Sequence, residues 1–313
     1  SLTTINAHQN TIDAMNWTTS PQTIGGILVD IINLSTTVFT YTDNTTSTTE
    51  DTILTYNSSY DNTKILLKIN IGPSVIQIGA SNLESYQKAA FFSDNNDIGL
   101  TGSLTSLTFS PNSKLETIDS SAFTNCTKLG GNLTIPKSVG IIGAGAFKNC
   151  GNMNLKFESG SQLSKINNNT FNGTGLSGII TIPKSVTELG PSCFFYSVGD
   201  YSIKFEAGSL LTTIADYAFY DKNGSNGLRH ITLPPSLITI GKQAFQDCDV
   251  MTSITFEKGS LTGIGASIAT NIFNYCDKLT HIYAYNNTIL AMNWTAGQQQ
   301  SIGGISVTVE SLS

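Results

Sequence analysis

Few side chains in this chain have the types and spacing that catalysis requires. The histidines His8, His230 and His281 are far apart, and none has a second histidine or a carboxylate at the spacing of a zinc-protease helix. No His–Ser or His–Cys pair indicates an activated nucleophile. Gly143-Ala144-Gly145 begins like a dinucleotide-binding turn but lacks the third glycine. We therefore predict that the chain is not an enzyme and holds no cofactor.

A metal site is not expected either. The stretch from Asp94 to Asp97 starts like a calcium-binding loop, yet Ile98 occupies a ligand position and Thr105 replaces the closing glutamate. Zinc would need ligands paired at short spacing, and the five cysteines are separated by whole repeats.

Neutral polar residues replace charged ones. Only 12% of the 313 residues are charged, whereas Ser, Thr and Asn number 35, 40 and 28, a composition that suits secreted or cell-surface proteins. A net charge of −6 and a pI near 5.0 provide no basic patch for a phosphate backbone. No apolar run approaches the ~18 residues of a membrane span. We expect an extracellular or cell-surface location, no nucleic-acid partner, no membrane insertion, and any signal or anchor outside residues 1–313.

A phenylalanine recurs with the period of a solenoid coil. Successive members are 23 to 28 residues apart, and five of them follow Ala or Cys. They are Phe123, Phe147, Phe171, Phe194, Phe219, Phe245 and Phe273. A fixed period of about 20–50 residues is typical of repeat proteins, in which each coil packs only on its neighbours.

Each phenylalanine follows a segment with strand character. Apolar and polar residues alternate in runs such as Leu104–Phe109, which predicts a strand with one buried face. A turn and an apolar residue then lead to the phenylalanine; these apolar residues are Ile118, Ile142, Ile166, Leu189, Ile214, Ile240 and Ile264. The turn alternates between a Pro form, as at Pro136, and a Glu-x-Gly-Ser form, as at Glu158. Glu158, Glu206 and Glu257 are predicted to be solvated charges at the rim.

The ordered repeat Leu-x-x-Ile-x-Phe, then Ile, then Ala-Phe-x-x-Cys resembles the BspA-like leucine-rich repeats of bacterial and protist surface proteins. The resemblance covers roughly residues 65–285. It implies a right-handed leucine-rich repeat solenoid, α/β or mainly β, with a parallel β-sheet on one face and turns or short helices on the other. It also implies adhesion and aggregation rather than catalysis, and its motif fixes no ligand residues.

The cysteines follow the repeat. Cys126, Cys150, Cys248 and Cys276 come three residues after the phenylalanine, and Cys193 takes the alanine position before Phe194. We interpret them as small buried residues with free thiols. The alternative is a disulfide such as Cys126–Cys150, because neighbouring coils lie about 4.8 Å apart.

The two ends of the chain share a segment that contains both tryptophans, Trp17 and Trp294. Leu2–Ala7, Asn10–Thr18 and Ile24–Ile27 recur as Leu279–Ala284, Asn287–Thr295 and Ile302–Ile305, at an offset of 277 and then 278 residues. Either the chain is part of a tandem array whose units end in this segment, or two matching caps shield the ends of one solenoid.

We divide the chain into four parts. Residues 1–32 are a cap-like segment, 33–64 a Thr/Asn-rich β linker, 65–278 a solenoid of about eight coils, and 279–313 a C-terminal cap. The linker forms a small β-rich N-terminal segment, in which alternation predicts strands joined by a loop over residues 43–51.

Alternation with period two also predicts which side chains the sheet presents to solvent. The candidate binding face consists of Ser106, Thr108, Asn132, Thr134, Lys156, Thr181, Lys204, His230, Thr232, Thr255, His281, Tyr283 and Tyr285. Rows of threonine equally serve to stabilise a parallel sheet by cross-strand packing. Aromatic residues gather only at the C-terminal end of this face, as in interface hot spots, while Trp294 is expected to be buried in the cap.

These observations predict a non-catalytic adhesion or protein-interaction module. Its partner would be a matrix protein or a glycan on a host or neighbouring cell, bound through the solenoid surface. The alternative is a structural module of a tandem array or filament, which assembles by self-association through the duplicated segment.

Overall fold

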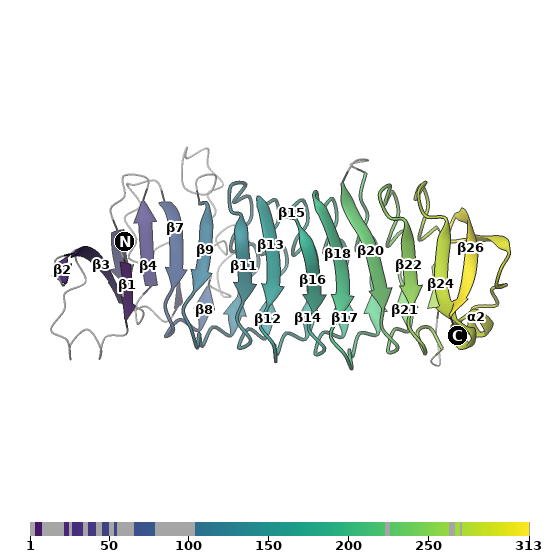
Figure 1. Cartoon of the computed structure of the whole chain (residues 1–313), viewed down its shortest axis with the longest axis horizontal. Helices are drawn as coiled ribbons and strands as arrows, with labels where there is room; N and C mark the ends of the chain where they lie inside the picture. Colours follow the sequence, from purple (N-terminus) through teal and green to yellow (C-terminus); the bar gives the residue numbers. More distant parts are fainter. Residues whose placement is uncertain are drawn as a thin grey trace.

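The chain winds into an elongated solenoid with its two ends at opposite ends of the axis (Figure 1). This computed structural model describes residues 66–78, 104–222, 226–262, 267–269 and 271–312, together with six short strands before residue 66, and describes side chains from residue 69 onward. The acidic loop from Asp94 and the repeat position Ile264 lie outside the described residues.

Long strands form the front of the solenoid in Figure 1. They are β7 (Leu66–Ile71), β9 (Ser106–Phe109), β11 (Gly131–Ile135), β13 (Asn152–Phe157), β16 (Gly178–Ile182), β18 (Asp200–Phe205), β20 (Gly227–Leu233), β22 (Ser253–Phe256) and β24 (His281–Tyr285). Hydrogen-bonded neighbours among them run parallel, with equivalent repeat positions in register, as Ile180 with Ile203. In β11 the predicted alternation holds, because Leu133 and Ile135 are buried while Asn132 and Thr134 are exposed.

A two-residue strand follows the turn after each long strand, and these short strands form a second row. They are β6 (Ile53–Leu54), β8 (Gln77–Ile78), β10 (Thr117–Ile118), β12 (Ile141–Ile142), β14 (Lys165–Ile166), β17 (Glu188–Leu189), β19 (Thr213–Ile214), β21 (Thr239–Ile240) and β23 (Ser267–Ile268). They pair in parallel in two ladders. In the last coil Ile268, not the predicted Ile264, pairs with Ile240. The prediction was wrong because more residues separate Phe256 from Ile268 than separate Phe205 from Ile214.

The repeat phenylalanines form a column in the core. All seven are fully buried, and neighbouring rings stack with centroids 5.2 to 5.7 Å apart and planes within 26° of parallel. The backbone of each phenylalanine turn also bonds to the next coil: the Phe123 amide donates to the Ala146 carbonyl at 2.7 Å and the Phe219 amide to the Ala244 carbonyl at 2.8 Å. The turn side therefore carries its own ladder of hydrogen bonds between coils.

Left-handed residues shape these turns. Ser121 and Asn125, two residues before and after Phe123, have φ of 60° and 61°, and Ser192 and Tyr196 around Phe194 have 55° and 51°. Gly and Asn adopt this conformation most readily, which explains why they recur beside the phenylalanines. The reversals direct the amides of residues 121, 123 and 125 toward carbonyls of the following coil. Turns thus fill this side; the helix in the described residues is α2 (Asn286–Ala291), in the C-terminal cap.

The front sheet is not one continuous ladder. Its strands fall into three sheets, with breaks between β9 and β11 and between β13 and β16. Gly131 and Gly178, with φ of 79° and 76°, begin the strands after the two breaks, and a left-handed residue interrupts regular strand pairing. At the second break β15 (Gly175–Leu176) pairs with β13 instead. One hydrophobic core cluster nevertheless runs through all the coils.

Strand β4 (Thr37–Tyr41) covers the N-terminal edge of the solenoid. It pairs antiparallel with β7 and, on its other side, with β5 (Thr46–Thr49). The β character predicted for the linker is confirmed, but β5 lies within the stretch predicted to be a loop. Because an unpaired strand edge invites aggregation, this hairpin protects the first coil.

The chain ends in strands that pair beyond the last coil. Strand β26 (Ile305–Leu312) runs parallel to β24 and antiparallel to β25 (Gln299–Ile302). At the N-terminus β1 (Thr4–Ala7), β2 (Gln22–Ile24) and β3 (Ile27–Asn33) form a separate sheet in the order β1-β3-β2. In the described part of the chain, helices fall short of the length and apolarity needed to cross a membrane.

Replacing Phe147 or Phe219 by alanine should lower the free energy of unfolding by about 3–5 kcal/mol, because each change leaves a cavity between stacked rings. Denaturant unfolding of the purified chain measures this loss. Ile141, which is 56% exposed, provides the control: Ile141→Ala should cost less than about 1 kcal/mol. Unchanged midpoints for both phenylalanine variants would contradict the ring column.

Candidate functional site

The predicted binding residues lie on the outer face of the front strands, hereafter the sheet face. The side chains of Thr108, Asn132, Thr134, Lys156, Thr181, Lys204 and His230 are exposed, and those of Ser106, Thr232, Thr255, His281, Tyr283 and Tyr285 are half-buried. Their neighbours along each strand point into the core, as Ile231 and Ile282 do. The placement is as predicted, and a role in ligand binding remains a prediction.

The structure brings together the residues of the C-terminal half of the sheet face. Strands β18, β20, β22, β24 and β26 carry Ser202, His230, Ser253, His281 and Thr308 at one register position. The next outward position carries Thr232, Thr255, Tyr283 and Glu310 in β20 to β26. Ser106 and Thr108 belong to another ladder, and so do Asn132, Thr134 and Lys156. The sheet face is thus continuous in hydrogen bonding only from β16 onward.

Several polar side chains of the sheet face bond to one another across coils. Asn154 donates from Nδ2 to Oδ1 of Asn132 at 3.2 Å, and Nδ1 of His230 and Oγ of Ser253 lie 3.0 Å apart. Such ladders stabilise the sheet. They also restrict the rotamers of these exposed side chains.

At the C-terminal end the sheet face becomes aromatic and charged. The rings of His281 and Tyr283 stack with centroids 6.2 Å apart, and Nε2 of His281 lies 3.9 Å from Oε1 of Glu310. Thr308 and Glu310 were missed by the sequence analysis, because the pairing of β26 with β24 was not foreseen. The alternation of Ile305, Val307 and Val309 was the available signal. Trp294 packs edge-on against Phe256 at 5.5 Å but is only half-buried, so the predicted burial of this ring in the cap holds in part.

In the core beneath the sheet face, several cysteine thiols donate hydrogen bonds to backbone carbonyls. In five coils the residue three positions after the repeat phenylalanine donates to the carbonyl of the previous phenylalanine, as Cys150 Sγ does to Phe123 O at 3.2 Å and Cys248 Sγ to Phe219 O at 3.1 Å; after Phe219 this position is Lys222. Thr174, Ser197 and Cys276 make the same bond in their coils. This position therefore accepts Cys, Ser or Thr, since each combines small volume with a donor.

The predicted burial of the cysteines is confirmed, and all five are free thiols in this structure. Burial raises the pKa of Cys126 from 9.0 to about 12, and it raises the pKa of Cys193 as well. Desolvation disfavours the thiolate, which is the form that reacts with electrophiles.

The rim glutamates are more than solvated charges. The Lys137 amide donates to Oε2 of Glu158 and the Lys184 amide to Oε2 of Glu206, each at 3.0 Å. Each carboxylate thus binds the first free amide after the proline of the preceding coil. In the third such turn Pro235 occupies the amide position and has no N–H to donate.

A second group of aromatic side chains lies outside the sheet face. The half-buried rings of Phe195, Tyr196, Tyr217 and Tyr220 contact one another, with Phe195 and Tyr220 stacked at 4.9 Å. Burial and a hydrogen bond to Asp247 raise the pKa of Tyr220. The sequence analysis placed surface aromatics only at the C-terminal end. The repeat itself contained the signal, because these residues flank Phe194 and Phe219.

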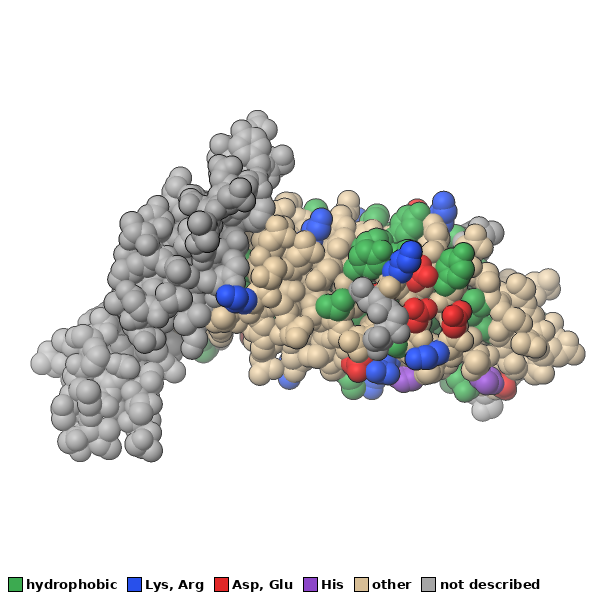
Figure 2. All heavy atoms as spheres, turned by 90° about the horizontal axis from the view of Figure 1, so that it is seen from above, with side chains coloured by type: hydrophobic (Ala, Val, Ile, Leu, Met, Phe, Trp, Pro, Cys, Tyr) green, Lys and Arg blue, Asp and Glu red, His purple; other side chains and the backbone are tan. Residues whose placement is uncertain are grey.

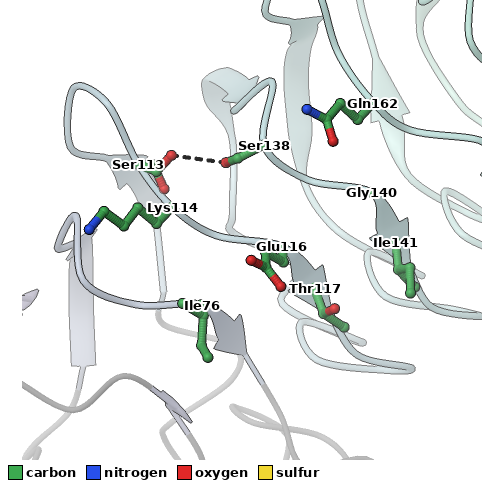
Figure 3. Close-up of a pocket in the computed structure, with 9 residues that line it drawn as sticks. All are labelled: Ile76, Ser113, Lys114, Glu116, Thr117, Ser138, Gly140, Ile141 and Gln162. Carbon is green, nitrogen blue, oxygen red and sulfur yellow. Dashed lines mark hydrogen bonds between the residues drawn. The ribbon is translucent and has the colours of Figure 1, made fainter.

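Figure 2 looks onto the upper edge of the solenoid and shows that neutral surface dominates the described coils, with hydrophobic, acidic and basic side chains gathered toward the C-terminal half. Near the other end, a groove of about 560 Å³ runs along the short strands (Figure 3). Its lining includes Ile76, Lys114, Glu116, Ile141 and Gln162, together with Ser113 and Ser138, which bridge two coils because Oγ of Ser138 donates to the Ser113 carbonyl at 2.9 Å. Among the described residues, no three His, Cys, Asp or Glu side chains are arranged to hold a metal ion.

The repeat decides the family. A family model described as "BspA type Leucine rich repeat region" matches six copies, over residues 98–226 and 195–295, which together span well over half of the chain. The chain belongs to the BspA-type leucine-rich repeat family. The family resemblance and the repeat solenoid predicted from the sequence are both confirmed, and the solenoid is mainly β.

Solved structures with similar folds include two bacterial proteins. The pneumococcal vaccine antigen PcpA is 17% identical, with a TM-score of 0.41 over 92% of this chain and 73% of that chain. A leucine-rich cell surface protein from Faecalibacterium prausnitzii is 18% identical, with a TM-score of 0.41 over 88% of this chain and 73% of that one. No curated protein sequence matches the chain.

The five thiols should resist alkylation in the folded chain near neutral pH and react fully in denaturant, because burial keeps them protonated. The raised pKa of Cys126 stabilises the fold below about pH 9, and this contribution should fall as the pH rises from 9.0 toward 12. Mass spectrometry after iodoacetamide treatment counts the modified thiols. Rapid labelling without denaturant would contradict their burial.

Single alanine substitutions on the sheet face should leave the fold intact. Thr232→Ala and His281→Ala should each change the free energy of unfolding by no more than about 0.5 kcal/mol, since both side chains lie at the surface and the His281–Glu310 pair is solvent-exposed. Thermal unfolding followed by circular dichroism measures this. A loss above about 2 kcal/mol would mean that the face is chiefly structural.

Proposed function

We propose that this chain is a non-catalytic interaction module of the cell surface or extracellular space, and that its sheet face binds a matrix protein or a glycan on another cell. Membership of the BspA-type repeat family supports an interaction role. The low charge and the abundance of Ser, Thr and Asn support an extracellular location.

The observation that carries the proposal is the continuous outer face of β16 to β24. Consecutive strands present polar side chains at fixed register, as Thr232, Thr255 and Tyr283 do. Because every second residue of these strands is buried in one core, the outward groups are held before a ligand arrives, which lowers the entropic cost of binding.

The chemistry of this face favours recognition by hydrogen bonds and ring contacts. Lys204 is a cation among mostly neutral groups, so long-range electrostatic steering is weak. Toward the C-terminus the stacked rings of His281 and Tyr283 provide an apolar surface with polar edges. Side chains of this kind dominate binding energy at protein interfaces.

The test compares binding of the intact chain and of a face variant, Thr232→Lys with Thr255→Lys, to immobilised fibronectin and laminin and to an array of mammalian glycans. We expect the intact chain to bind at least one of these probes and the face variant to bind it at least about tenfold more weakly, a difference of about 1.4 kcal/mol. Thr127→Lys with Thr187→Lys is the matched control, because both threonines are exposed away from the front strands.

Two outcomes would contradict the proposal. The intact chain would bind none of the probes, or the face variant and the control variant would bind equally well.

A further inference from the structure

The duplicated segment has the same strand pairing at both ends of the chain. At the C-terminus β24 pairs parallel with β26, His281 lying opposite Thr308, and β25 pairs antiparallel with β26, Ile302 lying opposite Ile305. At the N-terminus β1 pairs parallel with β3, Thr4 lying opposite Asp30, and β2 pairs antiparallel with β3, Ile24 lying opposite Ile27. Allowing for the offset of 277 and then 278 residues, the registers are identical.

The C-terminal copy closes the last coil through a defined set of contacts. Strand β22 pairs with β24, Trp294 packs on Phe256, and Thr288 donates from Oγ1 to the Ser260 carbonyl at 2.7 Å. The Phe273 amide, last of the phenylalanine ladder, donates to the Gly303 carbonyl at 2.8 Å. A Cβ on Gly303 would lie 2.7 Å from the Phe273 ring, and its φ is 61°, so this contact requires glycine.

The N-terminal copy keeps the residues that make these contacts. The buried or packed residues of the C-terminal copy are Leu279, Ile282, Ala284, Thr288, Ile289, Met292, Trp294, Ile302, Ile305, Val307 and Val309. Their counterparts are Leu2, Ile5, Ala7, Thr11, Ile12, Met15, Trp17, Ile24, Ile27, Val29 and Ile31, which are identical except for Ile31. Gly25 and Gly26 correspond to Gly303 and Gly304.

Differences between the copies fall where the C-terminal copy meets solvent. Thr4, Asn6 and Asp13 stand in place of His281, Tyr283 and the 79% exposed Leu290. The Gly25-Gly26 pair is also the two-residue turn of the β2–β3 hairpin, which by itself favours glycine, but a segment that only needed to be a stable hairpin would have no reason to keep Thr11. The pattern therefore matches retention of a docking surface for a coil.

Strand order shows which end of a solenoid this surface fits. In the C-terminal copy β24 lies between β22 and β26, whereas in the N-terminal copy β1 is the terminal strand of its sheet as far as the described strands show. The edge of β1 is thus the edge at which β24 receives β22. The start of this chain's own solenoid is covered by β4, which pairs with β7. This topology argues against two matching caps on one solenoid.

We propose that residues 2–33 close the last coil of a preceding copy of this unit in the same polypeptide, as residues 279–312 close the coil of residues 253–278. A separate molecule is a poorer partner, because its own residues 279–312 already occupy that site. By equivalence with the C-terminal copy, the contacts would be backbone pairing along β1 and those made by the positions that correspond to Trp294, Thr288 and Gly303. This inference is independent of ligand binding by the sheet face.

The first experiment replaces residues 279–312 of the full chain by residues 2–34. Limited proteolysis of the last coil should then be no more than about twofold faster than in the unaltered chain, because opening of the coil sets the rate. The matched control carries Thr11→Val and Trp17→Ala within the transplanted segment, and it should be cleaved at least about tenfold faster. Equal rates of cleavage for the transplant and its control would overturn the proposal.

A second protein guards against a folding failure at the new C-terminus. In it residues 1–278 are followed directly by residues 2–313, so that Leu2 takes the position of Leu279. Small-angle scattering should give a maximum dimension about twice that of the single unit, and protease should spare the junction. The proposal would also be overturned by preferential cleavage within the second copy of residues 2–33, which forms the junction, while residues 279–312 of the same molecule stay intact.

Discussion

Contact between consecutive coils is the interaction on which the rest of the molecule depends. A single coil has too little apolar surface to fold alone, and its phenylalanine is buried because neighbouring segments of the stack cover it on both sides. The stacked rings, 5.2 to 5.7 Å apart, and the amide bonds of the phenylalanine turns act at the same place. Strand pairing on the front adds to this contact but is interrupted twice, so the turn side and the core are what keep the coils in one stack.

The sequence alone was sufficient to predict the structure at positions where the same residue type recurs in the same environment in successive coils. The phenylalanines, the inward isoleucines and the outward positions of the front strands were all predictable from periodicity, because each coil repeats the same packing problem. Periodicity did not predict that Ile268 pairs with Ile240, because more residues separate Phe256 from Ile268 than separate Phe205 from Ile214. It also could not reveal that residues such as Tyr196 are left-handed, since the hydrogen bonds that require this conformation run to the next coil.

The candidate site was predictable in outline only. Alternation identified which side chains of β20 to β24 face outward, but Glu310 joins them through a pairing of β26 that no local pattern specifies. The aromatic group around Tyr220 was missed for a similar reason, because its members come from two coils and meet only when these coils stack. For the cysteines, position in the repeat predicted burial, whereas only the structure reveals the hydrogen bond to the carbonyl of the previous phenylalanine.

This architecture separates stability from recognition. Inward residues are nearly the same in every coil, whereas outward residues vary from Asn132 and Thr134 near one end to His281 and Tyr283 near the other. The duplicated segment shows the same division, with buried positions retained and exposed positions changed. A solenoid of this kind can vary its outer surface without disturbing its core, because the two sets of side chains alternate along each strand.

Amide hydrogen exchange on the intact chain tests most directly whether the phenylalanine turns hold the coils together. The amides of Phe123 and Phe171, which bond across the interruptions between β9 and β11 and between β13 and β16, should exchange as slowly as that of Phe219 within the uninterrupted sheet. Equal protection would mean that the column opens as one cooperative unit. Fast exchange of Phe123 and Phe171, with protection confined to the coils from β16 onward, would contradict this account.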